Sequence, residues 1–328
     1  MSTTKTKSRP KSRKATNDRA TTSSKPKRGK KAPPLELEAD RKKAKRSKSE
    51  KAKKAAKPKK AKKVAVSAKT ADRHQLYQWA VQSPEEDVKF LSRVYKKKRK
   101  KTALHFREDF CGTALLTAEW IRRGKKYTGE GFDICPDTIG WGVDNIFDDL
   151  GDDAERATLH VKDVREPSLV KPDVRAAQNF SYFVFKERAE LMDYLRAAYE
   201  DLADDGVFVM DIYGGPDSMM EMEEVRDIEE GFTYVWDQVA YWPATGEYKA
   251  HIHFRFEDGS QMKRAFTYDW RLWSLTEIRD ALLEAGFPEV ESFWEGTDED
   301  GESGNGIYRR SKRGENCEAW VTYLVAYK

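Results

Sequence analysis

The residues best suited to ligand chemistry are a short glycine-containing turn and an acid that follows it. Residues 104–114 read LHFREDFCGTA, and residues 129–134 read GEGFDI. The pattern indicates a strand, a tight turn, a helix and a second strand that ends near Asp133. Because Gly112 has no Cβ, the turn can bring backbone N–H groups close to a ligand. Asp133 can accept hydrogen bonds from ribose hydroxyls, so this order of elements predicts a nucleotide site.

Alternating apolar segments predict the elements that hold this turn in place. Helices are expected at 72–95, with Pro84 opening a second helix, and at 114–123, 136–147 and 187–202. Strands are expected at 103–106, 127–134, 157–161, 174–184 and 206–212. This alternation predicts an α/β fold, in which a mostly parallel sheet is covered by helices on both faces.

Polar side chains stand at the ends of the predicted strands. Glu108, Asp133, Asp163 and Asn179 each come at or just after such an end. Ligands of open parallel sheets bind outside the carboxyl ends of the strands, where the strand order reverses. The coincidence of these four side chains therefore strengthens the predicted site beyond what the turn alone indicates. Dinucleotide binding is one alternative for the turn, although the spacing of glycines in this sequence fits the dinucleotide-binding motif less well.

From about residue 72 to its end, the chain resembles the class I S-adenosylmethionine-dependent methyltransferases. The string REDFCGTA (107–114) is similar to their first motif, and LTEI at 275–278 with EAGF at 284–287 is similar to a helix and turn of the family. Phe110 and Ala114 stand where the first and third glycines of that motif are usual. The resemblance implies a Rossmann-like fold, S-adenosyl-L-methionine as the cofactor and methyl transfer as the activity (EC 2.1.1.-).

The resemblance also implies roles for individual residues. Glu108 matches the acid that orders the turn and reaches the methionine part of the cofactor, Asp133 the acid that binds the ribose, and Asp163 the acid beside the adenine. Residues 71–102 would form N-terminal helices and a lid, with Tyr77 near the sulfonium; simple amphipathic packing is the alternative for Tyr77. The cofactor-binding residues expected in this way are Tyr77, Arg107, Glu108, Phe110, Cys111, Gly112, Thr113, Asp133, Ile134, Asp163, Val164, Asn179 and Phe180.

A different pattern begins near Gly231. Segments 232–236, 247–256 and 261–268 read as strands, the last two joined by an Asp258–Gly259 turn, so an antiparallel insertion is expected at 231–273. Its many aromatic residues would suit a cation, an amine or a flat ring as substrate. The alternative is that these rings only pack the small sheet. The substrate-binding residues expected are Tyr182, Trp242, His253, Tyr268, Trp270 and Arg271.

Three side chains of this chain could act as a general base. His251 and His253 lie two apart in a predicted strand and share one face, and Tyr182 lies where the family's motif faces the transferred methyl. No further Cys or His completes a metal site around the histidine pair, so no metal is expected. Arg271 could bind a substrate carboxylate, or it could form a surface salt bridge.

Charge divides the chain in two. Residues 1–70 hold 27 Lys and Arg against 5 Asp and Glu and no aromatic residue, whereas the other 258 residues hold 34 basic and 51 acidic residues. A disordered basic tail at 1–70 and a methyltransferase domain at 71–328 are therefore expected. Such a tail would bind nucleic acid weakly and without sequence preference, or would only solubilise the protein.

The remaining sequence features bear on compartment. No apolar stretch of about 18 residues is present, and no secretory leader is recognisable. Three scattered cysteines fit a reducing compartment. A cytoplasmic protein is expected, with nucleoid or nuclear association possible through the tail. The oligomeric state is not predicted.

Three functions remain open on sequence grounds. The first is methylation of a small amine, hydroxyl or carboxyl compound by in-line displacement, in which alignment supplies much of the rate. A second is methylation of a nucleic acid or protein that the basic tail tethers. The third is a non-catalytic module associated with nucleic acid.

Overall fold

The computed structural model describes residues 66–297 and 304–328. The chain divides into two units, Met1–Lys62 and Lys63–Lys328, and the described residues belong to the second. The predictions of disorder and of nucleic-acid binding for the basic tail therefore lie almost wholly outside the described residues. Residues 66–70 are an exception. Val66 and Ala68 pack against a hydrophobic cluster of the body, and the Ala68 N–H donates to Ser260 Oγ at 3.0 Å.

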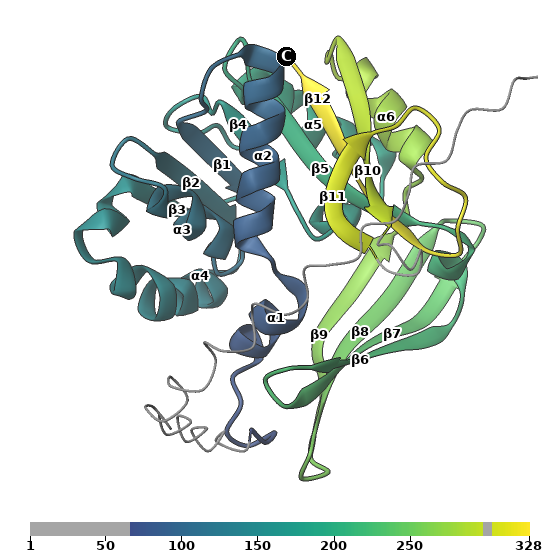
Figure 1. The fold of residues 1–328 in the computed structure, drawn as a ribbon. Helices are drawn as coiled ribbons and strands as arrows, with labels where there is room; N and C mark the ends of the chain where they lie inside the picture. Colours follow the sequence, from purple (N-terminus) through teal and green to yellow (C-terminus); the bar gives the residue numbers. More distant parts are fainter. Residues whose placement is uncertain (1–65, 298–303) are drawn as a thin grey trace, which may run out of the picture. The chain divides into compact units, whose positions relative to one another are not determined.

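Eight of the strands in the described residues form one sheet in the order β11-β10-β12-β5-β4-β1-β2-β3 (Figure 1). The first five along the chain run parallel, and β12 pairs antiparallel with β5 and β10. The strand order reverses between β1 and β4, which pair directly with each other. The strands are β1 (His105–Asp109), β2 (Thr128–Asp133), β3 (Ala157–Val161), β4 (Val174–Ala177), β5 (Val207–Gly214), β10 (Glu289–Thr297), β11 (Gly304–Arg310) and β12 (Trp320–Tyr327).

Helices cover both faces of this sheet, as the alternating pattern predicts. Along β5, Phe208 and Met210 join the cluster that contains α5 and α6, while Val207 and Val209 join the cluster on the other face. This double burial explains why the first half of β5, residues 207–210, is wholly apolar. The helices of one face are α2 (Pro84–Arg99), α3 (Leu115–Arg122) and α4 (Pro136–Gly142), and those of the other are α5 (Arg188–Asp201) and α6 (Leu275–Glu284).

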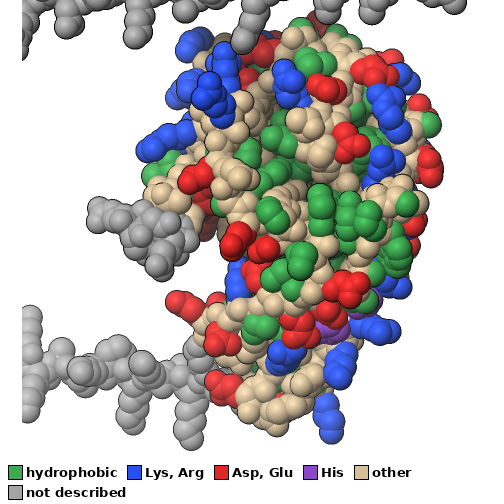
Figure 2. All heavy atoms as spheres, turned by 90° about the vertical axis from the view of Figure 1, so that its right-hand side faces the viewer, with side chains coloured by type: hydrophobic (Ala, Val, Ile, Leu, Met, Phe, Trp, Pro, Cys, Tyr) green, Lys and Arg blue, Asp and Glu red, His purple; other side chains and the backbone are tan. Residues whose placement is uncertain are grey.

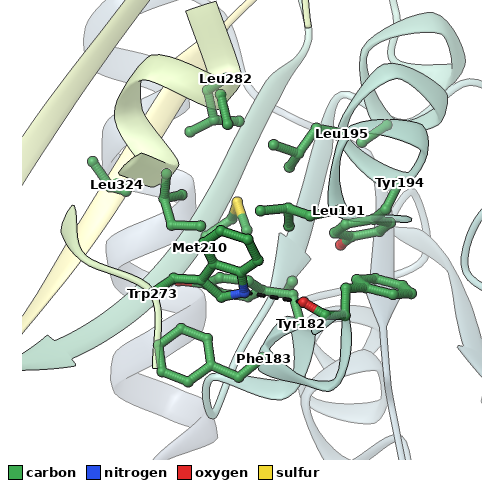
Figure 3. Packing of buried hydrophobic residues seen from close by; sticks show 14 of the residues in the cluster. Tyr182, Phe183, Leu191, Tyr194, Leu195, Met210, Trp273, Leu282 and Leu324 are labelled. Atoms are coloured by element: carbon green, nitrogen blue, oxygen red, sulfur yellow. Dashed lines mark hydrogen bonds between the residues drawn. The ribbon is translucent and has the colours of Figure 1, made fainter. Parts of the chain in front are cut away.

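Trp273 anchors the α5–α6 side of the core. Figure 3 shows its indole among Tyr182, Leu191 and Met210, and its Nε1–H donates to the Phe185 carbonyl at 3.1 Å. The bond satisfies the polar edge of a large buried ring. It also ties the segment after β9 to the short helix η3 (Ser181–Val184).

A second, four-stranded antiparallel sheet follows η4 (Pro216–Met219). Its strands are β6 (Met222–Ile228), β7 (Phe232–Trp242), β8 (Glu247–Phe256) and β9 (Gln261–Arg271). The sheet begins earlier than the predicted 231–273, because β6 is a charged and exposed edge strand without the apolar alternation that marks a half-buried one. On its buried face, Ile252 and Phe254 pack with Leu76 and Ala80 of α1 (Arg73–Val81).

Several predicted strand boundaries change in the structure, and two of these changes bear on the predicted site. The strand expected at 174–184 ends at Ala177, because Asn179 and Phe180 take left-handed backbone angles (φ 58° and 57°) and a short helix follows. The first strand runs from His105 to Asp109 instead of 103–106, which places Glu108 inside it. The strands β10, β11 and β12 were not among the predicted elements.

The described surface carries charges of both signs. On the face shown in Figure 2, acidic and basic side chains are interspersed around exposed hydrophobic ones. This face therefore lacks the single-sign basic stripe that typically marks a nucleic-acid-binding surface. Among the described residues, no helix is long and apolar enough to cross a membrane.

A cluster of buried charges joins β1, β4 and α5. Arg107 and Arg175 are register partners on neighbouring strands, and both side chains are fully buried. Asp109 accepts from Arg107 Nε at 2.7 Å and from Arg175 Nε at 2.6 Å, and Asp201 accepts from both guanidinium groups at 3.0 and 3.2 Å. The two positive and two negative charges balance, and the Val164 carbonyl accepts from both arginines.

Asp201→Asn should destabilise the protein by about 3–5 kcal/mol, because it leaves two buried guanidinium groups with one carboxylate. Urea denaturation followed by circular dichroism measures this loss. Asp193→Asn, on the same helix but exposed, is the matched control and should change stability by less than about 0.5 kcal/mol. A loss at Asp201 no larger than that of the control would contradict the assigned role of the cluster.

Candidate functional site

A cleft of about 230 Å³ lies at the carboxyl ends of β1, β2 and β4. This is the point where the strand order reverses, and ligands of such sheets bind there. Side chains of α1 and β9 complete its walls. The lining residues are His74, Tyr77, Gln82, Glu108, Asp109, Phe110, Cys111, Gly112, Thr113, Asp133, Thr138, Gln178, Asn179, Ser181, Phe266 and Tyr268.

The turn after β1 has an alternating left-handed backbone. Phe110, Gly112 and Ala114 have φ angles of 54°, 53° and 56°. A non-glycine residue pays roughly 1–2 kcal/mol for this conformation, so Phe110 and Ala114 are strained. These are also the two positions where the family that the sequence resembles usually has glycine. Glycine adopts this left-handed backbone without strain, which explains its use there. Strain of this kind concentrates at functional sites.

Asp133 ties that turn to the start of α4. Its Oδ2 accepts from the Gly112 N–H at 2.9 Å, and its Oδ1 accepts from the Cys135 N–H at 2.8 Å. The carboxylate lines the cleft while it holds two backbone segments in place. Its predicted ribose contact stays a prediction, and each carboxylate oxygen can accept a further hydrogen bond.

Glu108 is a buried carboxyl group on the floor of the cleft. Its Oε2 accepts from the Thr117 N–H at 2.8 Å and from Thr117 Oγ1 at 2.6 Å. Burial nevertheless raises the pKa of Glu108 to about 8. At neutral pH the group therefore holds a proton, and a cationic ligand group beside it would favour release of that proton.

Asp211, on β5, supports the opposite wall. Its carboxylate accepts from the Asn179 N–H at 2.7 Å and from the Phe180 N–H at 2.9 Å. These bonds hold the left-handed pair that ends β4, and so they position Gln178, Asn179 and Ser181 along the cleft. Burial raises the pKa of Asp211 to about 7.

The helix α1 is hydrogen-bonded to the turn, and Asp72 at its start is hydrogen-bonded to α4. Gln78 Nε2 donates to Thr113 Oγ1 at 3.0 Å, and Asp72 Oδ2 accepts from the indole N–H of Trp141 at 3.0 Å. Tyr77 on the same helix lies 5.0 Å from the ring of Phe266. Burial raises the pKa of both Tyr77 and Tyr268, and the two hydroxyl groups also interact with each other. Aromatic rings of α1 and β9 therefore pack against each other where they line the cleft.

The structure brings most of the predicted cofactor residues together, but not all. Those that line the cleft are Tyr77, Glu108, Phe110, Cys111, Gly112, Thr113, Asp133 and Asn179. The others lie outside this lining. Arg107 and Val164 belong to the buried charge cluster, and Asp163 bonds to Arg165. Phe180 packs on Tyr213, and Ile134 is 73% exposed outside the lining.

The histidine pair does not face the cleft. On β8, Ala250 and Ile252 pair with the cleft-lining residues Tyr268 and Phe266, so His251 and His253 point to the opposite face of the sheet. There, His253 bonds to Asp237 and His251 to Thr267. Neither histidine is among the described residues that line the cleft. Among the described residues, no group of three or more His, Cys, Asp or Glu side chains could hold a metal ion.

Of the predicted substrate residues, only Tyr268 lines the cleft. Tyr182 is part of the core seen in Figure 3; its hydroxyl donates to the Asp211 carbonyl, and burial raises its pKa far above the ordinary value. Trp270 is buried beneath Tyr268, and Trp242 lies at the end of β7 outside the lining. Arg271 stacks on Trp273 and donates to the Lys186 carbonyl, away from the cleft.

Several lining residues escaped the sequence analysis. They are His74, Gln82, Asp109, Thr138, Gln178, Ser181 and Phe266. Gln178 and Phe266 carried a usable signal, because one follows β4 directly and the other shares a strand face with Tyr268. His74 and Gln82 carried none, since their place depends on how α1 packs. The ring of His74 lies 5.3 Å from that of Trp141, which puts it on the β2 side of the cleft.

Comparison with known proteins rests on the fold. No protein-family model matches the sequence, and no curated protein matches it. The structure is similar to an S-adenosylmethionine-dependent methyltransferase from Clostridium acetobutylicum ATCC 824, with a TM-score of 0.59 and 15% identity over 77% of this chain and 96% of that one. The chain has a methyltransferase fold.

Two further solved structures share this methyltransferase fold. One is CalS10, an amino pentose methyltransferase from Micromonospora echinaspora, with a TM-score of 0.55 and 16% identity over 77% of this chain and 95% of that one. The other is DesVI from Streptomyces venezuelae, with a TM-score of 0.55 and 17% identity over the same shares of the two chains. The predicted Rossmann-like class is confirmed, including its antiparallel sheet.

Glu108→Gln should flatten the pH dependence of stability. Because the folded pKa of Glu108 is raised, the folded state holds a proton that the unfolded chain has released, and wild-type stability falls as the pH rises from about 4.5 to 8. Release of that proton lowers the free energy of unfolding by up to about 1.4 kcal/mol per pH unit. The amide that replaces the carboxyl group cannot ionise, so this dependence on pH is lost in the variant. Urea denaturation at pH 5 and pH 8 measures the change, with the exposed Glu85→Gln as control. Parallel profiles for wild type and Glu108→Gln would contradict the assignment.

Proposed function

We propose that the protein is an S-adenosylmethionine-dependent methyltransferase that acts on a small molecule. The observation that carries the proposal is the placement of the strained turn at the β1–β4 reversal point, between the Glu108 and Asp133 carboxyl groups. The fold as a whole is similar to that of a solved S-adenosylmethionine-dependent methyltransferase.

The residues present fit the cofactor. Asp133 would hold the ribose hydroxyls, the backbone of the turn around Gly112 would approach the cofactor closely, and Glu108 would accept from the ammonium of its methionine part. Tyr77 would cover it from α1. When bound, S-adenosylmethionine supplies an electrophilic methyl group attached to a sulfonium. Asp163 is not included, since its carboxylate is bound to Arg165.

The chain's own contribution to the reaction is alignment and exclusion of water. Transfer of that methyl group to a lone pair of the acceptor would leave the electrons of the broken carbon–sulfur bond on sulfur. The proton that the acceptor nitrogen or oxygen loses passes to solvent. Tyr77, Phe266 and Tyr268 supply apolar surface around the reacting atoms, and holding two reactants in line accounts for most of the rate.

An amine is the preferred acceptor. No Lys or Arg is among the described residues that line the cleft. A carboxylate acceptor would find no cationic partner there. The similar structures include an amino pentose methyltransferase and KedS8, a sugar N-methyltransferase with a TM-score of 0.50 and 17% identity over 84% of this chain and 99% of that one. These names agree with an amine acceptor.

Calorimetric titration of S-adenosylhomocysteine into the full-length protein tests the cofactor site. Micromolar binding is expected, and Asp133→Ala should weaken it at least tenfold by removing the ribose acceptor and releasing the turn. Asp137→Ala is the matched control, because it removes an exposed carboxylate one turn further along and should leave binding unchanged. Absence of binding by folded wild-type protein would overturn the proposed function.

A further inference from the structure

Two amide side chains that line the cleft each have one buried atom without a hydrogen-bond partner. Gln178 is 8% exposed, and its Nε2 is buried without a partner. Gln82 Oε1 is likewise buried without a partner, and both residues line the cleft. A buried polar atom left unpaired costs about 1–3 kcal/mol, so two of them in one cleft call for an explanation.

Neighbouring polar groups do not supply the missing bonds. The nearby amide of Gln78 donates to Thr113, and the backbone N–H of Asn179 donates to Asp211. Gln178 is held rigidly, since it lies between the end of β4 and the left-handed pair that Asp211 fixes. Its amide is therefore kept in the cleft without a protein partner, as expected of a group that binds a ligand.

The position of Gln178 separates it from the ribose end of the cleft. Asp133 follows β2 and Gln178 follows β4, and β1 lies between these strands. Two strand spacings amount to roughly 10 Å. A cofactor whose ribose lies at Asp133 and whose methionine part lies at Glu108 therefore leaves Gln178 on its far side, where the acceptor must approach.

The two amides differ in hydrogen-bonding character. Gln178 Nε2 donates and needs a lone pair, whereas Gln82 Oε1 accepts and needs an N–H or O–H group. A carboxylate or phosphate could satisfy only the first. A molecule with neighbouring amine and hydroxyl groups satisfies both, and the rings of Tyr77, Phe266 and Tyr268 would cover its apolar face.

We propose that Gln178 and Gln82 form the acceptor subsite and select an amino alcohol of the amino-sugar type. Gln178 donates to a lone pair of the acceptor, and Gln82 accepts from one of its N–H or O–H groups. This proposal rests on the proposed function. It goes further, because it assigns the choice of acceptor to two residues outside the cofactor motifs.

The test measures acceptor binding apart from turnover. Full-length protein saturated with S-adenosylhomocysteine is titrated with glucosamine, glucose or glucuronate. The pH is kept above the pKa of the glucosamine amine. The amine is then neutral, so a carboxylate introduced by a Glu substitution gains no attraction from a positive charge on this probe. Wild type should bind glucosamine at least tenfold more tightly than glucuronate. Gln178→Glu, which exchanges the donor for an acceptor, should weaken glucosamine binding at least tenfold. Gln82→Glu keeps an acceptor oxygen and should therefore retain glucosamine binding.

Two controls make the outcomes distinguishable. Gln261→Glu makes the same exchange at an exposed position of β9 and should change nothing. Gln178→Leu and Gln82→Leu should each weaken glucosamine binding while S-adenosylhomocysteine still binds. Equal responses of the two Glu variants, loss of S-adenosylhomocysteine binding in them, or no glucosamine binding by wild type would overturn the subsite. Failure of wild type to bind S-adenosylhomocysteine would instead overturn the proposed function.

Discussion

The cleft depends on the bridging of two buried arginines by Asp109. Arg107 and Arg175 stand side by side on β1 and β4, where like charges would repel, and the Asp109 carboxylate binds one with each oxygen. Tyr194 donates a further hydrogen bond to it at 2.7 Å. Asp109 is the last residue of β1, and the strained turn begins at the next residue, Phe110. The charge cluster therefore fixes the point from which the turn starts.

A second carboxyl group plays the matching role on the other wall. Asp211 holds the two left-handed residues after β4, as Asp133 holds Gly112 after β1. In each place a side-chain carboxylate binds backbone N–H groups that no strand or helix uses. The irregular segments of the cleft are thus set by carboxylates at the ends of β2 and within β5. The described residues that line the cleft include three carboxyl groups and no Lys or Arg.

Sequence analysis predicted the sheet, its helices and the cofactor turn, because these features follow from local periodicity and from glycine. It misplaced residues whose position depends on packing. Arg107 stands beside the cofactor motif in sequence, yet its side chain leaves the cleft for the charge cluster. His251 and His253 share a face, as predicted, but periodicity alone did not show which face meets the cleft. Gln82 could be found only once the position of α1 was known, and β6 only once its pairing with β7 was known.

The position of α1 has a consequence for how ligands exchange. The helix bonds to the turn through Gln78 and to α4 through Asp72, so a molecule resting on the turn lies beneath it. Each of these neutral or singly charged bonds contributes only about 0.5–3 kcal/mol, a barrier that thermal motion crosses readily. Leu76 and Ala80 meanwhile keep the helix packed on the antiparallel sheet, which also carries Phe266 and Tyr268. Since α1 and that sheet pack together and both carry residues that line the cleft, a displacement of either one would change the shape of the cleft.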